Sequence, residues 1–126
     1  MNRQQLLTEA KTTVFHLKKE EQRNINPYAA FAHQVIGLLG KGKISTREEV
    51  LEYTRLSYSR PGLNRQWRVF GTVLERNLKS TLEKEDILLF FGYLKRLLTI
   101  EGKKQADDRN KSREERSGHS RKRGER

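Results

Sequence analysis

Positively charged side chains recur at helical spacing within residues 64–79, and their chemistry suits phosphate binding. With about 100° of rotation per residue, one arc of about 80° holds Arg65, Arg68, Thr72, Arg76 and Lys79. The opposite side of this helix carries Trp67, Phe70, Val73 and Leu74. Arginine can bind phosphate through two hydrogen bonds, and a row of cations about 20 Å long matches successive backbone phosphates. Because acidic residues do not interleave with this row, we predict a nucleic-acid-binding face, extended by Arg60 in the preceding turn.

A second basic cluster surrounds a glycine-containing loop and consists of Lys41, Lys43 and Arg47. The glycines would let the loop approach a nucleic-acid backbone closely, although the same pattern fits an ordinary loop between helices. Gly37 to Lys43 also match the spacing of a phosphate-binding loop. Ile44 stands where that motif needs a hydroxyl, and a helical pattern precedes it, so we do not expect nucleotide hydrolysis.

No other group of residues indicates catalysis. The chain has no cysteine, its three histidines are widely spaced, and no nucleophile–base pair or metal cluster is recognisable. We therefore expect a protein that is not an enzyme and that uses neither a metal nor another cofactor.

Helix breakers and capping residues predict the elements that must position these side chains. They divide the chain into five helices, over residues 3–22, 26–40, 45–57, 64–79 and 80–102. Asn26-Pro27 marks one start, and Ser45 with Glu48 or Thr46 with Glu49 marks another. The expected fold is an all-α compact bundle of about five helices, with Trp67 and Phe91 in its core. Phe90 and Tyr93 lie off the centre of the last apolar stripe, so we expect them to contact a protein partner.

Composition separates a bundle domain, residues 1–102, from a charged tail, residues 103–126. Ala106 is the one aliphatic residue of the tail, which cannot bury enough apolar surface to order itself, so we expect disorder there. The net charge is +11, of which the tail contributes +5 and the bundle +6. A basic bundle with a basic tail favours a polyanionic partner. Neither a signal peptide nor a membrane-spanning segment is recognisable, so we expect a cytoplasmic protein without membrane contact.

The pattern of the last two predicted helices, residues 64–102, resembles that of the small subunits of type III CRISPR interference complexes. The similarity lies in the arginine-bearing helix and in the aromatic and leucine-rich segment Ile87-Leu88-Leu89-Phe90-Phe91-Gly92-Tyr93-Leu94. This resemblance implies an antiviral defence role for several copies stacked along a guide RNA–target RNA duplex, which contact its backbone without reading sequence and have no active site.

The leading hypothesis is therefore a non-catalytic, sequence-independent RNA-binding subunit of a ribonucleoprotein complex, with other subunits and neighbouring copies as partners. One alternative is a DNA-binding regulator that uses residues 45–79 as a helix–turn–helix, although the turn is longer than usual. Another is a helical adaptor that docks on a protein through its exposed aromatic side chains.

Overall fold

The computed structural model describes the backbone of residues 2–22 and 24–124, and the side chains of residues 2–22 and 24–111. The described backbone is helical, without strands. Its elements are α1 (Arg3–Glu20), α2 (Asn26–Gly40), α3 (Arg47–Arg55), the short 3₁₀ helix η1 (Pro61–Leu63), α4 (Asn64–Asn77) and α5 (Lys84–Gly124). The prediction of an all-α bundle of about five helices is confirmed.

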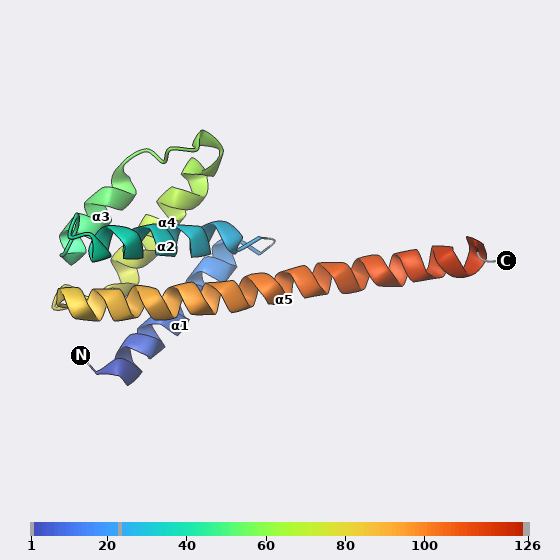
Figure 1. Ribbon diagram of the computed structural model, residues 1–126, viewed down its shortest axis with the longest axis horizontal. Coiled ribbons are helices and arrows are strands. Elements are labelled where there is room, and N and C mark those ends of the chain that lie inside the picture. Colours follow the sequence, from blue (N-terminus) through green and yellow to red (C-terminus); the bar gives the residue numbers. More distant parts are fainter. Residues whose placement is uncertain (1, 23, 125–126) are drawn as a thin grey trace.

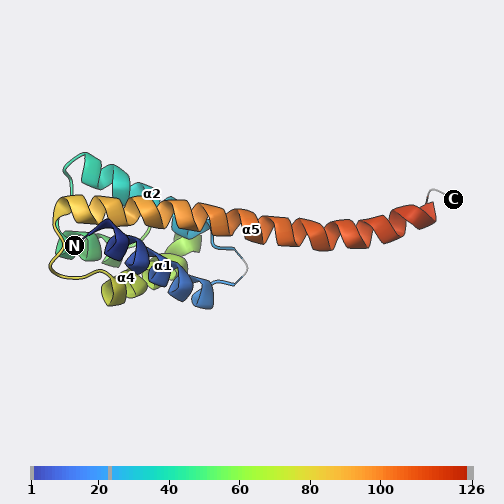
Figure 2. The same ribbon diagram turned by 90° about the horizontal axis from the view of Figure 1, so that it is seen from below.

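Helix α5 is the central element of the bundle, and its first half packs against both α1 and α2. Figures 1 and 2 show α5 running along the bundle and continuing well beyond the other helices. Helices α2 and α5 are antiparallel: Asn26 lies against Gly102, and His33 Nδ1 is 2.9 Å from Lys95 Nζ. Helix α4 packs on α1 and α2, and α3 packs on α4.

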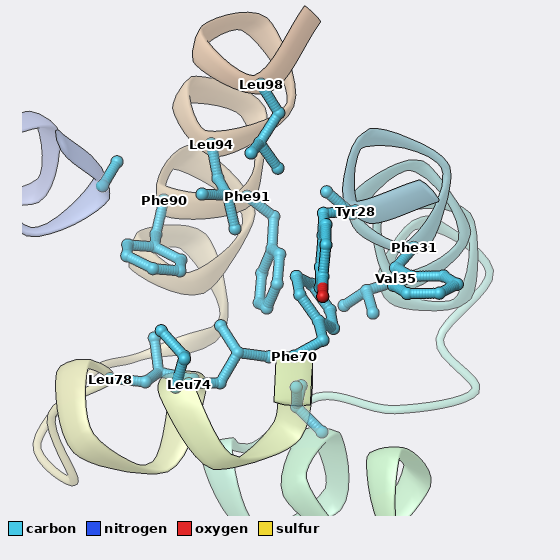
Figure 3. Close-up of a cluster of buried hydrophobic side chains, with 14 of the residues drawn as sticks. Tyr28, Phe31, Val35, Phe70, Leu74, Leu78, Phe90, Phe91, Leu94 and Leu98 are labelled. Atoms are coloured by element: carbon cyan, nitrogen blue, oxygen red, sulfur yellow. The ribbon is translucent and has the colours of Figure 1, made fainter. Parts of the chain in front are cut away.

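Aromatic side chains from three helices fill the centre of the core (Figure 3). The ring of Phe70 on α4 contacts Tyr28 and Phe31 on α2 and Phe91 on α5, with centroid distances of 5.6–6.4 Å. Trp67 is also buried, as predicted, and its indole Nε1 donates a hydrogen bond to the Leu56 carbonyl at 2.9 Å. Burial raises the pKa of Tyr28 to about 12. These contacts fix the inward face of α4.

The start of α3 follows one of the two predicted caps. Thr46 is the N-cap, and its hydroxyl accepts a hydrogen bond from the Glu49 backbone N–H at 3.1 Å. The Ser45 hydroxyl donates to the Glu49 carboxylate at 3.1 Å, and hydrogen bonds from Ser45 and Thr46 hold the pKa of that carboxyl below its usual range. The loop after α2 thereby leads into α3 in a defined direction.

The last helix begins later and extends further than the sequence predicted. It starts at Lys84 rather than at residue 80, because residues 78–83 form the non-helical connection from α4. It also does not end at Gly102, which is buried where a Cβ would lie 2.1 Å from Asn26 Oδ1. This glycine therefore permits a close approach of α2 instead of ending a helix.

Part of the expected tail is consequently attached to the bundle. Residues 103–111 continue α5, and the Gln105 side-chain amide bonds to the loop between α1 and α2. Its Oε1 accepts from Ile25 N at 2.8 Å, while its Nε2 donates to Gln22 O at 3.3 Å. The side chains of residues 112–124 and all of residues 125–126, where disorder was also expected, lie outside the described residues.

Gly71 provides a direct test of the packing between α3 and α4. A Cβ at this position would lie 2.7 Å from Thr54 Oγ1 and 3.0 Å from Thr54 Cβ. We expect Gly71→Ala to lower the free energy of unfolding by about 1–3 kcal/mol, because the two helices would have to separate. Urea denaturation measures the change.

Gly37→Ala is the matched control, since nothing lies within 4 Å of its added Cβ. It should raise the free energy of unfolding by up to about 1 kcal/mol through helix propensity alone. Similar increases in the free energy of unfolding for both substitutions would contradict the close packing of α3 on α4.

Candidate nucleic-acid interface

A groove of about 380 Å³ runs along α4 beside the C-terminal end of α1, which contributes Glu20 to its lining. Three of the predicted phosphate-binding residues line it, namely Arg65, Arg68 and Arg76. Its apolar lining comes mainly from Val69, which is partly exposed, because Val73 at its base is only 2% exposed. The groove therefore combines guanidinium groups with apolar surface along one helix.

The direction of these arginines follows from the opposite face of α4. Trp67, Phe70, Val73 and Leu74 are all at most 2% exposed, whereas Arg65, Arg68 and Arg76 are exposed. The helical periodicity predicted this division correctly. At 1.5 Å per residue, Arg65 to Arg76 span about 16 Å along the helix axis.

Two cations of the predicted row form ion pairs with acidic residues of α1 or its C-cap. Arg65 Nη2 lies 2.9 Å from Glu21 Oε2, and Lys79 Nζ lies 3.5 Å from Glu9 Oε1. These pairs connect the first half and the C-terminal end of α1 to opposite ends of α4. Lys79 also lies beyond Asn77, where α4 ends, so it does not extend the helical row as predicted.

Arg68 and Arg76 differ from these paired cations. Among the residues whose side chains the structure describes, neither has an ion-pair partner. Both are exposed and line the groove, with Thr72 between them. The Thr72 hydroxyl donates to the Arg68 carbonyl at 3.0 Å, so its own hydrogen is already used. Arg68 and Arg76 are therefore the best placed groups for an external anion.

Arg47 has a structural role that the sequence did not reveal. Its Nε donates to the Leu78 carbonyl at 2.6 Å and its Nη2 donates to the Glu75 carbonyl at 3.1 Å. A helix C-terminus leaves such carbonyls without intrahelical partners, and an arginine can satisfy them. Because its guanidinium is engaged in this way, Arg47 is less available to a phosphate than the sequence pattern suggested.

The other predicted basic residues lie outside the groove. Lys41 and Lys43 are exposed in the loop between α2 and α3, and Gly42 adopts a left-handed conformation with φ of 72°. The backbone N–H groups of these three residues bond to carbonyls of α2, which leaves them unable to surround a phosphate. Arg60 is exposed just before η1. These residues could contact only a polymer that continues past the groove.

Of the two aromatic residues predicted to contact a partner, Phe90 lies in the core and Tyr93 is partly exposed. Phe90 is fully buried and packs edge-on against Phe91 with centroids 5.2 Å apart. Tyr93 is partly buried against the core. The prediction for Phe90 is wrong, because α1 and α2 both pack against α5 and bury a wider part of its surface than a single helix would.

Acidic residues next to α4 were missed from the sequence. Glu20 lines the groove, Glu21 pairs with Arg65, and Glu9 pairs with Lys79 beyond the end of α4. The pattern within residues 64–79 contains no signal for these pairs, since both acids come from a segment far away in the sequence. Their contact with α4 is a property of the tertiary packing.

Comparison with known proteins gives no further indication of function. No protein-family model matches the chain, and neither a curated protein nor a solved structure matches it significantly. Within the described residues, no helix is long and apolar enough to cross a membrane, and no group of three metal-ligating side chains converges.

Replacement of Arg47 tests whether this residue stabilises the fold by capping α4. We expect Arg47→Ala to lower the free energy of unfolding by about 1.5–3 kcal/mol, because carbonyls at the end of α4 are deprived of a charged donor. Lys43→Ala, which removes an exposed charge from the same region, should change it by less than about 0.5 kcal/mol. Chemical denaturation measures both values, and equal stability of the two variants would contradict the capping role.

Proposed function

We propose that the protein is a non-catalytic RNA-binding subunit that holds an RNA backbone in the groove between α1 and α4. The observation that carries the proposal is the convergence of Arg65, Arg68 and Arg76 on this one groove. Arg68 and Arg76 supply guanidinium groups whose hydrogen-bond donors are not committed to acidic partners among the described side chains. Arginine in such a position favours phosphate through paired, charge-assisted hydrogen bonds.

The chemistry of the groove favours binding that does not depend on sequence. Base edges are read mainly by bidentate arginine, asparagine and glutamine contacts, and phosphate contacts carry no base information. Of these three residue types the groove lining contains only arginine, which also binds phosphate, and the hydroxyl hydrogen of Thr72 is directed to the Arg68 carbonyl. The arginines lie in one row along α4, as backbone phosphates would require.

The resemblance of residues 64–102 to the small subunits of type III CRISPR interference complexes makes the proposal more specific. It suggests a small subunit of a CRISPR type III-like effector complex, in which other subunits and further copies of this chain share the RNA. The net charge of +11 supports such a polyanionic partner through counterion release. The exposed Lys41, Lys43 and Arg60 would then add diffuse attraction where the RNA leaves the groove.

Duplex DNA is a less suitable partner. A helix–turn–helix joins its two helices through three or four residues. Here the longer segment Leu56–Leu63, which includes the short helix η1, separates α3 from α4. In addition, α1 packs against α4 and places Glu20 beside the arginines of the groove. This arrangement favours a backbone that lies along α4 over the insertion of α4 into a major groove.

The double substitution Arg68→Ala/Arg76→Ala tests the proposal. We expect it to weaken binding of single-stranded RNA and to make the dependence of log Kobs on log salt concentration shallower by about 1.4. This value corresponds to about 0.7 for each phosphate of a single strand that the variant no longer neutralises. Fluorescence anisotropy over a salt series measures the slope, and RNAs of different sequence should give the same result.

Arg3→Ala/Arg96→Ala is the matched control, because it removes the same charge from residues outside the groove. It should leave the salt slope nearly unchanged. Equal changes in both double variants would show that only net charge matters. Preferential binding of one duplex DNA sequence would instead favour a regulator, and both results would overturn the proposal.

A further inference from the structure

A second groove, of about 280 Å³, lies between α1 and α5. Each helix contributes residues at positions i, i+3, i+4 and i+7, which form one continuous stripe on a helix. The stripe of α1 consists of Lys11, Val14, Phe15 and Lys18, and that of α5 consists of Leu97, Ile100, Glu101 and Lys104. Two such stripes side by side form the kind of surface into which a third helix packs.

The middle of this groove exposes two large apolar side chains. Phe15 is 55% exposed and Ile100 is 49% exposed, and the one other large hydrophobic residue this exposed in the described part is Leu56. Val14 and Leu97 lie beside them and are more buried. Adjacent exposed apolar side chains in a groove with a polar rim are typical of a protein-binding surface.

The rim of the groove is positively charged. Lys11, Lys18 and Lys104 lie around the apolar centre, with Glu101 as its one acidic residue. Glu101 pairs with Lys18 at 3.1 Å and with Lys104 at 3.7 Å, so it balances one of these charges and leaves a net charge of +2. The Lys19 ammonium adds a further cation, 4.5 Å from the centroid of the Phe15 ring.

We propose that this groove binds an acidic amphipathic helix of a partner protein. The apolar face of such a helix would cover Phe15 and Ile100, and its flanking carboxylates would reach Lys11, Lys18 and Lys104. The chain's own C-terminal segment does not fit this description, because residues 103–126 carry ten basic and five acidic residues. Most of the apolar surface is aliphatic, which suits helix packing better than the stacking of bases.

A synthetic helical peptide tests this site in the full-length protein. It carries leucine at positions i, i+3, i+4 and i+7 and glutamate at its flanking positions, and a control peptide has lysine in place of each glutamate. Fluorescence anisotropy should detect binding of the acidic peptide and not of the basic one. Phe15→Ser/Ile100→Ser should weaken that binding by about tenfold or more, because it removes the apolar centre of the site.

Two control variants separate this site from other surfaces. Leu56→Ser removes the third exposed apolar side chain and should leave peptide affinity unchanged, as should Arg68→Ala/Arg76→Ala in the groove between α1 and α4. Because Arg68 and Arg76 belong to the proposed RNA-binding groove, unchanged peptide affinity in this variant would show that the peptide binds elsewhere. Equal peptide affinity of wild type and Phe15→Ser/Ile100→Ser, or no binding of the acidic peptide, would overturn the proposal.

Two further outcomes would assign the groove to a different occupant. Displacement of the peptide by RNA, together with weaker RNA binding in Phe15→Ser/Ile100→Ser, would identify a nucleic-acid site. Self-association of the wild-type protein that this double substitution abolishes, measured by sedimentation, would identify a second copy of the chain. Either outcome would overturn the proposal of an acidic partner helix.

Discussion

The burial of one face of α4 is the constraint on which the rest of the structure depends. Phe70 contacts rings from α2 and α5, and Trp67 holds the Leu56 carbonyl in the connection from α3. A helix fixed so firmly on one side cannot rotate without exposing large aromatic surfaces, which would cost several kcal/mol. The direction of Arg65, Arg68 and Arg76 is thus a consequence of core packing.

Helix α1 determines how the cations of α4 are used. Glu9 and Glu21 pair with Lys79 and Arg65 at opposite ends of the interface between the two helices, and Arg47 caps the end of α4 from α3. These cations stabilise the arrangement of helices, although pairs as exposed as these contribute little individually. Arg68 and Arg76 remain between them. The cations that form one row in the sequence therefore divide into Arg65 and Lys79, which pair with acidic residues, and Arg68 and Arg76, which are available to a ligand. Helix α1 also borders a second groove, on the side that faces α5.

The helical periodicity and the capping residues predicted the fold class, most helix positions and the division of α4 into two faces. They did so because side-chain burial, the capping hydrogen bond at Thr46 and the restricted backbone angle of Pro27 all act over a few residues. Partners distant in sequence were not predictable. Gly102 resembles a helix end but allows Asn26 to approach, Arg47 resembles a phosphate ligand but binds carbonyls of α4, and Phe90 is covered by the core. Each depends on a contact between separate helices.

Arginine side-chain NMR in the presence of RNA tests the central claim most directly, because each Nε–H signal reports on one guanidinium. RNA should shift the Nε–H signals of Arg68 and Arg76, whereas that of Arg47, which already donates to the Leu78 carbonyl, should stay in place. The proposed interface would be contradicted if the signals of Arg68 and Arg76 did not move while the backbone signals of residues after Gly102 shifted. RNA would then bind the basic C-terminal segment and not the groove between α1 and α4.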